Sequence, residues 1–501
     1  MTRYLVPTLF LVSIMAVALS GSRASADAEV PLVALHEPEN PLVAFRVMFR
    51  SGSVDDPPGQ EGITALAARM MADGGTENLT SAQLLEALFP MAADLSVHCD
   101  KEVTVFTGRV HKDHLQKYLV LYTDVLLRPR WDPKEFDRLR DVQLSGIENE
   151  LRSNDDEEFG KETLEWMLYE GHPYGHPVDG TVAGVNALDP EAVRAHAAKV
   201  FTKNRVVLGL AGGYSEEALA SLRDALRRLP EGAPPVAIPE PNPTGPKVVI
   251  VEKDAAATAI SMGFPYGLRR TDPEFTAMWL GTSAFGEHRQ SGGRLFQALR
   301  EKRGLNYGDY AYCETFRQAG GGTHPQVNIG RNRHFYSIWI RPVEHQNRVF
   351  AIRCAIWQLD NLLRVGLSND EVEQTKGFLD GYTRLWELTT TRRLGFALDD
   401  LFNGTRAHLE SSRERFPSLT TAEVNAALKK WIDPKQLRYA IITSDAAAMR
   451  DALVSGVSSP IEYPTPKPPE ILEQDEEFIG APLWIGPEDV MVVKAGEMFE
   501  R

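Results

Sequence analysis

Cysteine is scarce in this chain, with three residues in 501. Cys99, Cys313 and Cys354 are widely separated and odd in number, which excludes a disulfide framework and a metal-knuckle spacing. Three small buried residues are the simpler interpretation. No Gly-x-Ser-x-Gly, P-loop or dinucleotide fingerprint occurs in a supporting context, so no local motif indicates a serine hydrolase or a nucleotide-binding enzyme.

Basic residues are fewer than acidic ones. The sequence has 54 basic and 69 acidic residues, a formal net charge of −15. Such a surface repels phosphates, so we expect no nucleic-acid partner, and it is compatible with basic peptide substrates. Hydrophobic residues make up 43% and charged residues 25%, which allows a sizeable globular core.

Long apolar runs are confined to the N-terminus. Arg3 precedes the apolar run Leu5–Leu19, and Ala24-Ser25-Ala26 forms a small-residue cleavage site before Asp27. This pattern predicts a signal peptide over residues 1–26. An N-terminal membrane anchor is the alternative, although the run is short for a spanning helix. We therefore expect an exported, periplasmic protein with no membrane association after signal cleavage.

The chain shows signs of an internal duplication. Asp189–Leu210 and Thr420–Thr443 share a helix–break–strand layout, and a Pro-rich linker lies between them. Chance similarity between two such pieces is the alternative. The pattern predicts an α+β fold with two duplicated halves, divided into residues 1–26 (signal peptide), 27–238 (N-terminal domain), 239–246 (linker), 247–457 (C-terminal domain) and 458–501 (a Pro-rich and acidic C-terminal arm).

Local patterns predict the elements that matter for function. Gly62–Asp73 is expected to be an apolar helix that ends at Gly74-Gly75, and Leu95–Val110 a strand or hairpin. Gly293–Arg303 reads as a helix ended by Gly304. The C-terminal arm is expected to be extended and to pack across the body or onto a partner.

One string is specific enough to indicate a family. Gly293–Tyr307 reads GRLFQALREKRGLNY and closely resembles the corresponding segment of bacterial pitrilysin/insulinase-family zinc peptidases. Gly62–Thr76, Gly171–Gly175 and Arg205–Gly213 are also similar, and the resemblance extends over about residues 30–455. It implies two duplicated halves, each an antiparallel sheet covered by helices, arranged as a clam-shell.

The chain departs from the family pattern at the zinc-binding motif. Active members carry His-x-x-Glu-His on the first-half helix, where two histidines bind zinc and the glutamate polarises the metal-bound water. Here these positions fall on Ala65, Ala68 and Arg69. Alanine offers no lone pair and arginine is cationic, so we expect no zinc to be bound by this chain.

A second feature of the family is retained. By resemblance, Arg300 and Tyr307 form the pair that binds substrate across the chamber. A guanidinium and a phenol donate hydrogen bonds suited to a peptide carbonyl and to the oxyanion formed on attack by water. From spacing alone, Arg300 would be a surface helix residue and Tyr307 a core strand residue.

Other candidate metal ligands are weak. Glu148 and Glu150 lie near the expected position of the distal zinc ligand, but they are interpreted as helix-surface charges. His111-x-x-His114 and His172-x-x-x-His176 lack a glutamate placed as a base and are interpreted as ordinary polar histidines.

The resemblance implies the non-zinc subunit of a heterodimeric metallopeptidase, which binds extended peptides and assists hydrolysis at the zinc site of a family partner. A non-catalytic scaffold or peptide-binding protein of the same fold is the alternative. An autonomous peptidase with unorthodox ligands is a third, without a His/Glu cluster to support it. The peptide is expected to add as a strand to a sheet edge.

Overall fold

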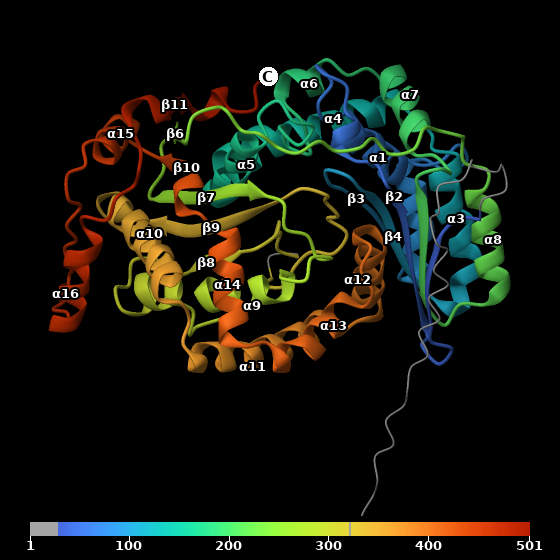
Figure 1. The fold of residues 1–501 in the computed structure, drawn as a ribbon. Helices are drawn as coiled ribbons and strands as arrows, with labels where there is room; N and C mark the ends of the chain where they lie inside the picture. Colours follow the sequence, from blue (N-terminus) through green and yellow to red (C-terminus); the bar gives the residue numbers. More distant parts are fainter. Residues whose placement is uncertain (1–28, 320–321) are drawn as a thin grey trace, which may run out of the picture.

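Two halves, each built on one β-sheet, lie side by side in the computed structural model of the chain (Figure 1). The structure describes residues 29–319 and 322–501, so the predicted signal peptide lies outside the described residues. The expected α+β fold with two sheet-and-helix halves is confirmed.

Both sheets are mixed. The first has the order β1–β5–β2–β4–β3 and the second the order β11–β6–β10–β7–β9–β8. Pairing is parallel for β1 with β5, β10 with β6 and β11 with β6, and antiparallel elsewhere, where fully antiparallel sheets were expected. Parallel neighbours are joined by long crossovers and leave no local hairpin signal, so the sequence pattern does not reveal them. The strands are β1 Leu32–His36, β2 Leu42–Phe49, β3 Asp94–Cys99, β4 Thr104–His111, β5 Val206–Gly212, β6 Val248–Glu252, β7 Thr258–Tyr266, β8 Asp309–Tyr312, β9 His334–Val343, β10 Arg438–Thr443 and β11 Val490–Lys494.

Helices cover the outer face of each sheet, and each half has its own apolar core there. Those of the first half are α1 Ile63–Asp73, α2 Ser81–Leu88, α3 Leu115–Leu127, α4 Pro133–Ser145, α5 Asp156–Leu168, α6 Val182–Asn186, α7 Pro190–Val200 and α8 Glu216–Leu226. Those of the second are α9 Phe275–Gly286, α10 Arg348–Val365, α11 Asn369–Trp386, α12 Thr390–Asn403, α13 His408–Arg415, α14 Thr421–Trp431, α15 Ala446–Val454 and α16 Pro469–Phe478. The predicted helix at Gly62–Asp73 and the hairpin at Leu95–Val110 are confirmed as α1 and β3–β4. The segment Phe296–Glu301 is π-helical.

The halves exchange one helix each. Helix α5, from the first half, packs its Phe159 and Leu164 with Val251 and Ile442 of the second sheet. Helix α12, from the second half, places Leu398 against Val105 and Val207 of the first sheet, and Figure 1 shows it beside that sheet. Each sheet is therefore covered on its second face by a helix encoded in the other half.

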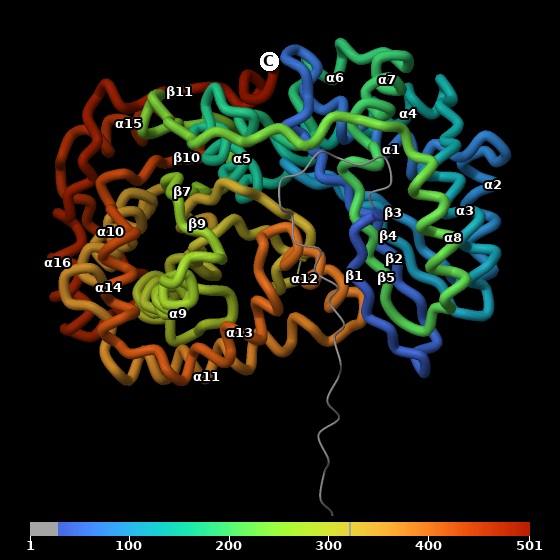
Figure 2. The backbone as a smooth tube through the Cα atoms, turned by 45° about the vertical axis from the view of Figure 1, so that its right-hand side comes forward, coloured from blue at the N-terminus to red at the C-terminus, as the bar shows by residue number. Residues whose placement is uncertain are grey.

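The Pro-rich segment crosses from one half to the other. Residues 230–247 contain no helix or strand, and Figure 2 shows this stretch running over the top of the molecule. At the C-terminal end, β11 adds a parallel strand to β6. The backbone N–H of Val182 donates to the carbonyl of Phe499, whose side chain is buried beside Phe159. The arm therefore packs across the body.

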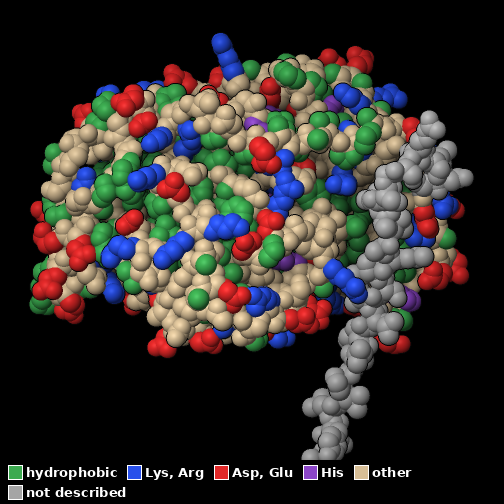
Figure 3. Space-filling model, in the orientation of Figure 1, with side chains coloured by type: hydrophobic (Ala, Val, Ile, Leu, Met, Phe, Trp, Pro, Cys, Tyr) green, Lys and Arg blue, Asp and Glu red, His purple; other side chains and the backbone are tan. Residues whose placement is uncertain are grey.

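Acidic and basic side chains intermingle on the face in Figure 3, and carboxylates gather toward the end that carries α16, whose sequence is PEILEQDEEF. Within residues 29–319 and 322–501, no helix combines the length and hydropathy that a bilayer span requires.

Candidate functional site

A buried carboxylate fixes the start of α1. Asp56 accepts hydrogen bonds from the backbone N–H groups of Gly62 (2.7 Å) and Thr64 (3.0 Å) and from the Thr64 hydroxyl. Burial raises the pKa of Asp56 to about 7, even though these hydrogen bonds oppose the shift. Gly62 has φ of +100°, a conformation that glycine adopts without strain. This capping sets the direction of the helix and of the face that carries Ala65, Ala68 and Arg69.

That face lines a cavity of about 470 Å³ between the two halves. The first half supplies α1, the edge strand β3 and the turn around Asp179, and the second half supplies Arg317 and Gln326. Helix α5 also contributes Glu158 and Glu162 to the lining. The three degenerate motif positions therefore lie together at the chamber formed by both halves.

Arg69 is held firmly at this site. Its Nη2 lies 2.8 Å from Oδ1 of Asp179, and its Nη1 donates to Oε1 of Gln143 at 2.9 Å. The Gln143 amide in turn donates to the backbone carbonyls of Gly62 and Asp179. The guanidinium thus ties α1 to α4 and to the Asp179 turn.

The residues present do not fit a zinc ion. Ala65 and Ala68 offer no donor atoms, and the cationic Arg69 lies at the third motif position. Glu150 lines the cavity, but one carboxylate does not hold zinc. In the described part of the chain, no group of three or more His, Cys, Asp or Glu side chains is arranged to hold a metal ion.

A buried ionic network forms one end of the cavity. Arg331 is fully buried; its Nη2 lies 2.7 Å from Asp100 Oδ1 and its Nη1 2.6 Å from Glu165 Oε1. Burial alone would raise the pKa of Asp100, but the guanidinium groups of Arg331 and Arg317 hold it well below its usual range. Arg317 also pairs with Glu158 and Glu162. Two arginines of the second half therefore bind carboxylates of the first.

The cavity carries an excess of acid. Its lining includes six carboxylates against two arginines, Arg69 and Arg317. Burial lowers the pKa of His98, although the nearby Asp100 opposes the shift, so this imidazole is neutral at pH 7. The carboxylates are Asp100, Glu150, Asp155, Glu158, Glu162 and Asp179. A cationic segment of a ligand would be favoured here.

Arg300 and Tyr307 lie together, as the family resemblance implies. The Arg300 guanidinium carbon is 4.4 Å from the centroid of the Tyr307 ring and 4.8 Å from that of Phe296. Tyr307 is 68% exposed, so it is not a core residue. Among the described residues, no carboxylate lies within 4 Å of the Arg300 guanidinium, and its N–H donors remain available to a ligand.

Arg300 and Tyr307 are not among the residues that line the 470 Å³ cavity. Arg341, whose guanidinium carbon is 5.4 Å from the Tyr307 ring centroid, forms a 2.7 Å ion pair with Glu157. The next residue of α5, Glu158, lines the cavity. The pair is thus linked to the chamber wall through the first turn of α5.

The sequence pattern missed most of the cavity's polar side chains. Asp179 meets Arg69 across 110 positions and Arg317 meets Glu158 across 159, separations at which no local motif could reveal the contact. The histidine pairs are separate from this site. His111 and His114 lie at the surface, and His172 bonds the backbone of Tyr174 and of Pro239.

Comparisons with known proteins agree with this fold. Residues 32–182 match the model of the insulinase family (peptidase family M16), and residues 187–378 match the M16 inactive-domain model. An uncharacterized zinc protease of Streptomyces coelicolor is 24% identical over 398 residues, 77% of this chain and 81% of the relative. A non-peptidase homolog from Helicobacter pylori is 21% identical and covers 87% of this chain and 98% of its own length.

Solved structures extend the match to three dimensions. The M16 inactive domain from Pseudomonas fluorescens has a TM-score of 0.72 at 21% identity and covers 82% of this chain and 95% of its own. A chain in a structure of Complex III2 from Candida albicans has a TM-score of 0.66 at 14% identity, covering 92% of this chain and 97% of its own. The family models span both halves in the order that the fold shows, and the chain belongs to the M16 (insulinase-like) peptidase family.

Proposed function

We propose that this chain is the non-zinc subunit of a two-chain peptidase and binds an extended peptide for a zinc-bearing M16 partner. The observation that carries the proposal is the chamber-facing side of α1, where the motif positions hold Ala65, Ala68 and an Arg69 that is paired with Asp179. The motif positions on α1 offer no zinc ligands, yet both halves line a large cavity beside them. The cavity therefore serves binding.

An extended peptide suits the geometry of the cavity. Strand β3 is the edge of the first sheet, pairs with β4 on one side only, and lines the cavity with Val97, His98 and Cys99. A peptide would add to its free edge through backbone hydrogen bonds. The excess of carboxylates around it favours peptides with Lys or Arg residues.

Arg300 and Tyr307 supply the contribution to hydrolysis. Their donors are exposed and close together, suited to a peptide carbonyl or oxyanion presented at the partner's zinc. The partner would provide zinc, base and water, and an exported, periplasmic location for both chains accords with the N-terminal sequence. Relatives named zinc protease and non-peptidase homolog accord with a family that contains both kinds of chain.

The test is reconstitution with an M16 protein that carries His-x-x-Glu-His. Each chain is purified, its zinc content is measured, and cleavage of a Lys-containing peptide is followed for each chain alone and for the mixture. We expect activity to rise on mixing, and Arg300→Ala to lower the joint kcat by about 10²–10³-fold, as for loss of one oxyanion donor. Arg364→Ala, on the exposed end of α10, is the matched control and should leave the rate unchanged.

A scaffold without a catalytic contribution is the second candidate. The similarity to a chain within Complex III2 favours it, because that chain belongs to a larger assembly. Full joint activity in an Arg300→Ala/Tyr307→Phe double variant would exclude the assisted-hydrolysis role and support the scaffold. Absence of both complex formation and activity with every His-x-x-Glu-His partner would overturn the two-chain proposal.

A further inference from the structure

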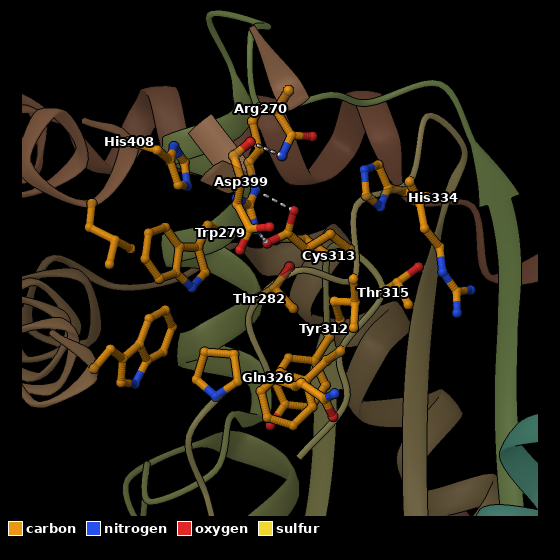
Figure 4. Close-up of a pocket in the computed structure, with 18 of the residues that line it drawn as sticks. Arg270, Trp279, Thr282, Tyr312, Cys313, Thr315, Gln326, His334, Asp399 and His408 are labelled. Carbon is orange, nitrogen blue, oxygen red and sulfur yellow. Dashed lines mark hydrogen bonds and ion pairs between the residues drawn. The ribbon is translucent and has the colours of Figure 1, made fainter. Parts of the chain in front are cut away.

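The second half contains a smaller cavity of about 60 Å³. It lies between α9 and β8, and Trp279, Thr282 and Ser283 line it from one face of α9 (Figure 4). Tyr312 and Thr315 face the same space from β8 and the residues that follow it. None of these residues is used in the proposed peptide site.

This cavity repeats the position of the first one. Ala65, Ala68 and Arg69 have the same i, i+3, i+4 spacing as Trp279, Thr282 and Ser283, and both sets line a cavity between the first helix of their half and an edge strand. The helix positions of the two sets differ by 214 residues. The same offset relates residues 97–100, which line the larger cavity from the strand side, to residues 311–314, which line the smaller one. The fold therefore builds the same kind of site twice.

Several buried polar atoms at the second cavity have no hydrogen-bond partner among residues 29–319 and 322–501. Glu287 is 4% exposed and its Oε2 is unsatisfied. The hydroxyls of Thr282, Ser283 and Thr315 are likewise buried without a partner. Buried polar groups are unfavourable without partners, so a cluster of them around one cavity favours a polar ligand there.

The charge of the lining favours a cation. Arg270 pairs with Glu314 through two hydrogen bonds of 2.9 Å, and Arg331 is engaged with Asp100 and Glu165. Glu287 has no cation within 4 Å among the residues that the structure describes. An uncompensated buried carboxylate is costly, and a bound cation would offset that cost.

Aromatic rings form the walls around this carboxylate. Trp279 and Trp386 lie with ring centroids 5.7 Å apart, and Tyr312 and Phe316 are stacked at 3.9 Å. All four rings line the cavity. Aromatic faces combined with one acidic group are the chemistry that recognises organic ammonium ions.

We propose that this cavity binds an organic ammonium group, with Glu287 as its counter-ion. The volume of about 60 Å³ is that of roughly four water molecules at about 15 Å³ each, enough for an ammonium head and a short alkyl stem. The Thr282, Ser283 and Thr315 hydroxyls accept hydrogen bonds from the ammonium. The proposal does not depend on peptide binding at the larger cavity.

Two sources share this chemistry. A free alkylamine is one, and a lysine side chain of a peptide held in the larger cavity is the other. Gln326 lines both cavities, so the two sites share a wall, and its Nε2 lies 3.1 Å from Nε2 of His98. The side-chain mimic n-butylammonium and a lysine-containing peptide separate the two cases.

Calorimetric titration of the full chain tests the proposal. We expect n-butylammonium to bind and quench tryptophan fluorescence, and the neutral isostere n-butanol to bind at least tenfold more weakly. Glu287→Gln removes the charge but keeps the shape of the side chain, and it should weaken n-butylammonium binding at least tenfold. Thr282→Val should weaken it less, and Glu414→Gln, an exposed residue of α13, is the matched control with no effect.

Titration with a lysine-containing peptide shows whether the ammonium comes from a peptide or from a free amine. If a lysine peptide binds better than its norleucine analogue and Glu287→Gln removes that difference, the ammonium comes from the peptide. If only n-butylammonium responds to Glu287→Gln, a free amine is the ligand. Equal binding of n-butanol and n-butylammonium, unchanged binding in Glu287→Gln, or no binding of n-butylammonium would each overturn the proposal.

Discussion

The two halves place a cavity between the same pair of elements but fill it with opposite chemistry. In the first half, Arg69 lies among carboxylates in a space of about 470 Å³. In the second, Trp279, Thr282 and Ser283 face Glu287 in about 60 Å³. The backbone places a cavity at the same position in each half. The three side chains on the first helix of the half then decide whether the protein itself provides a cation there, as Arg69 does, or whether a ligand must provide it.

Restoring the metal-binding motif should produce the largest change. The triple substitution Ala65→His/Ala68→Glu/Arg69→His places both histidines one turn apart on the face that meets Glu150. We expect about one zinc per chain with a Kd below about 1 μM, a binding free energy beyond about 8 kcal/mol. Elemental analysis after dialysis measures the stoichiometry.

The matched control for this gain keeps Arg69 in place. Ala65→His/Ala68→Glu alone retains the guanidinium and its ion pair with Asp179, so it should remain free of zinc. Equal zinc content in the double and triple variants would contradict the view that Arg69 blocks the site.

Arg331 and Arg270 both line the second cavity, and removing each in turn compares their two sets of ion pairs. Arg331→Met removes the cation closest to Asp100 and Glu165, leaving Lys101 3.5 Å from Glu165 and Arg317 3.9 Å from Asp100, and we expect a loss of about 3–5 kcal/mol in the free energy of unfolding. Arg270→Met leaves only Glu314, so its loss should be smaller. Urea denaturation measures both.

An exposed ion pair controls this experiment. Arg384→Met breaks the i,i+4 pair with Asp380 on α11 and should cost no more than about 0.5 kcal/mol. A similar loss for Arg331→Met and Arg384→Met would show that the buried network contributes little to stability.

The second cavity should respond to pH. Burial raises the pKa of Glu287 to about 7, the nearby polar side chains of Ser283 and Trp279 oppose the shift, and the charge of Glu314 adds to it. Ammonium binding requires the ionised form, so affinity for n-butylammonium should be about tenfold weaker at pH 6 than at pH 8. Calorimetry at both pH values checks this.

Asp399 also lines this cavity and burial raises its pKa to about 6, so the same titration in Glu287→Gln separates its contribution from that of Glu287. Burial raises the pKa values of Tyr312, Cys313 and Tyr382 and lowers those of His334 and His408, to about 4 and about 3 for the two histidines. All five are therefore neutral at both pH values. Because the folded-state pKa of Glu287 is raised, folding stability without ligand should fall as pH rises from about 4.5 to 7. A pH-independent affinity would remove Glu287 from the binding site.

The smallest effect should come from the exposed Tyr307. Tyr307→Phe removes one hydroxyl from a ring that is 68% exposed, so we expect the free energy of unfolding to change by no more than about 0.5 kcal/mol. Thermal unfolding measures it. A large loss would give Tyr307 a structural role and weaken its assignment to substrate binding.

Local signals account for the part of the molecule that the sequence predicts well. The α1 helix and the β3–β4 hairpin rest on contacts within a few residues, and both are confirmed. The proximity of Arg300 and Tyr307 follows from a specific string spanning one helix end. Such features need no knowledge of the tertiary fold.

Long-range contacts account for what the sequence did not reveal. The parallel partners of β1 and β6, the Arg69–Asp179 pair and the cavity beside Glu287 join residues far apart in the chain. The spacing of Trp279, Thr282 and Ser283 carries no recognisable motif, and only the position of α9 against β8 makes it a site. Tertiary packing decides which helix face meets a cavity.

The exchanged helices α5 and α12 affect how the molecule unfolds. Neither half retains a complete core once α5 or α12 leaves, because each helix fills the second face of the opposite sheet. Melting of either half uncovers apolar surface on the other, so both should unfold in a single cooperative transition despite their duplicated layout. A protease cut within residues 230–247 would sever the backbone and still leave two interlocked fragments.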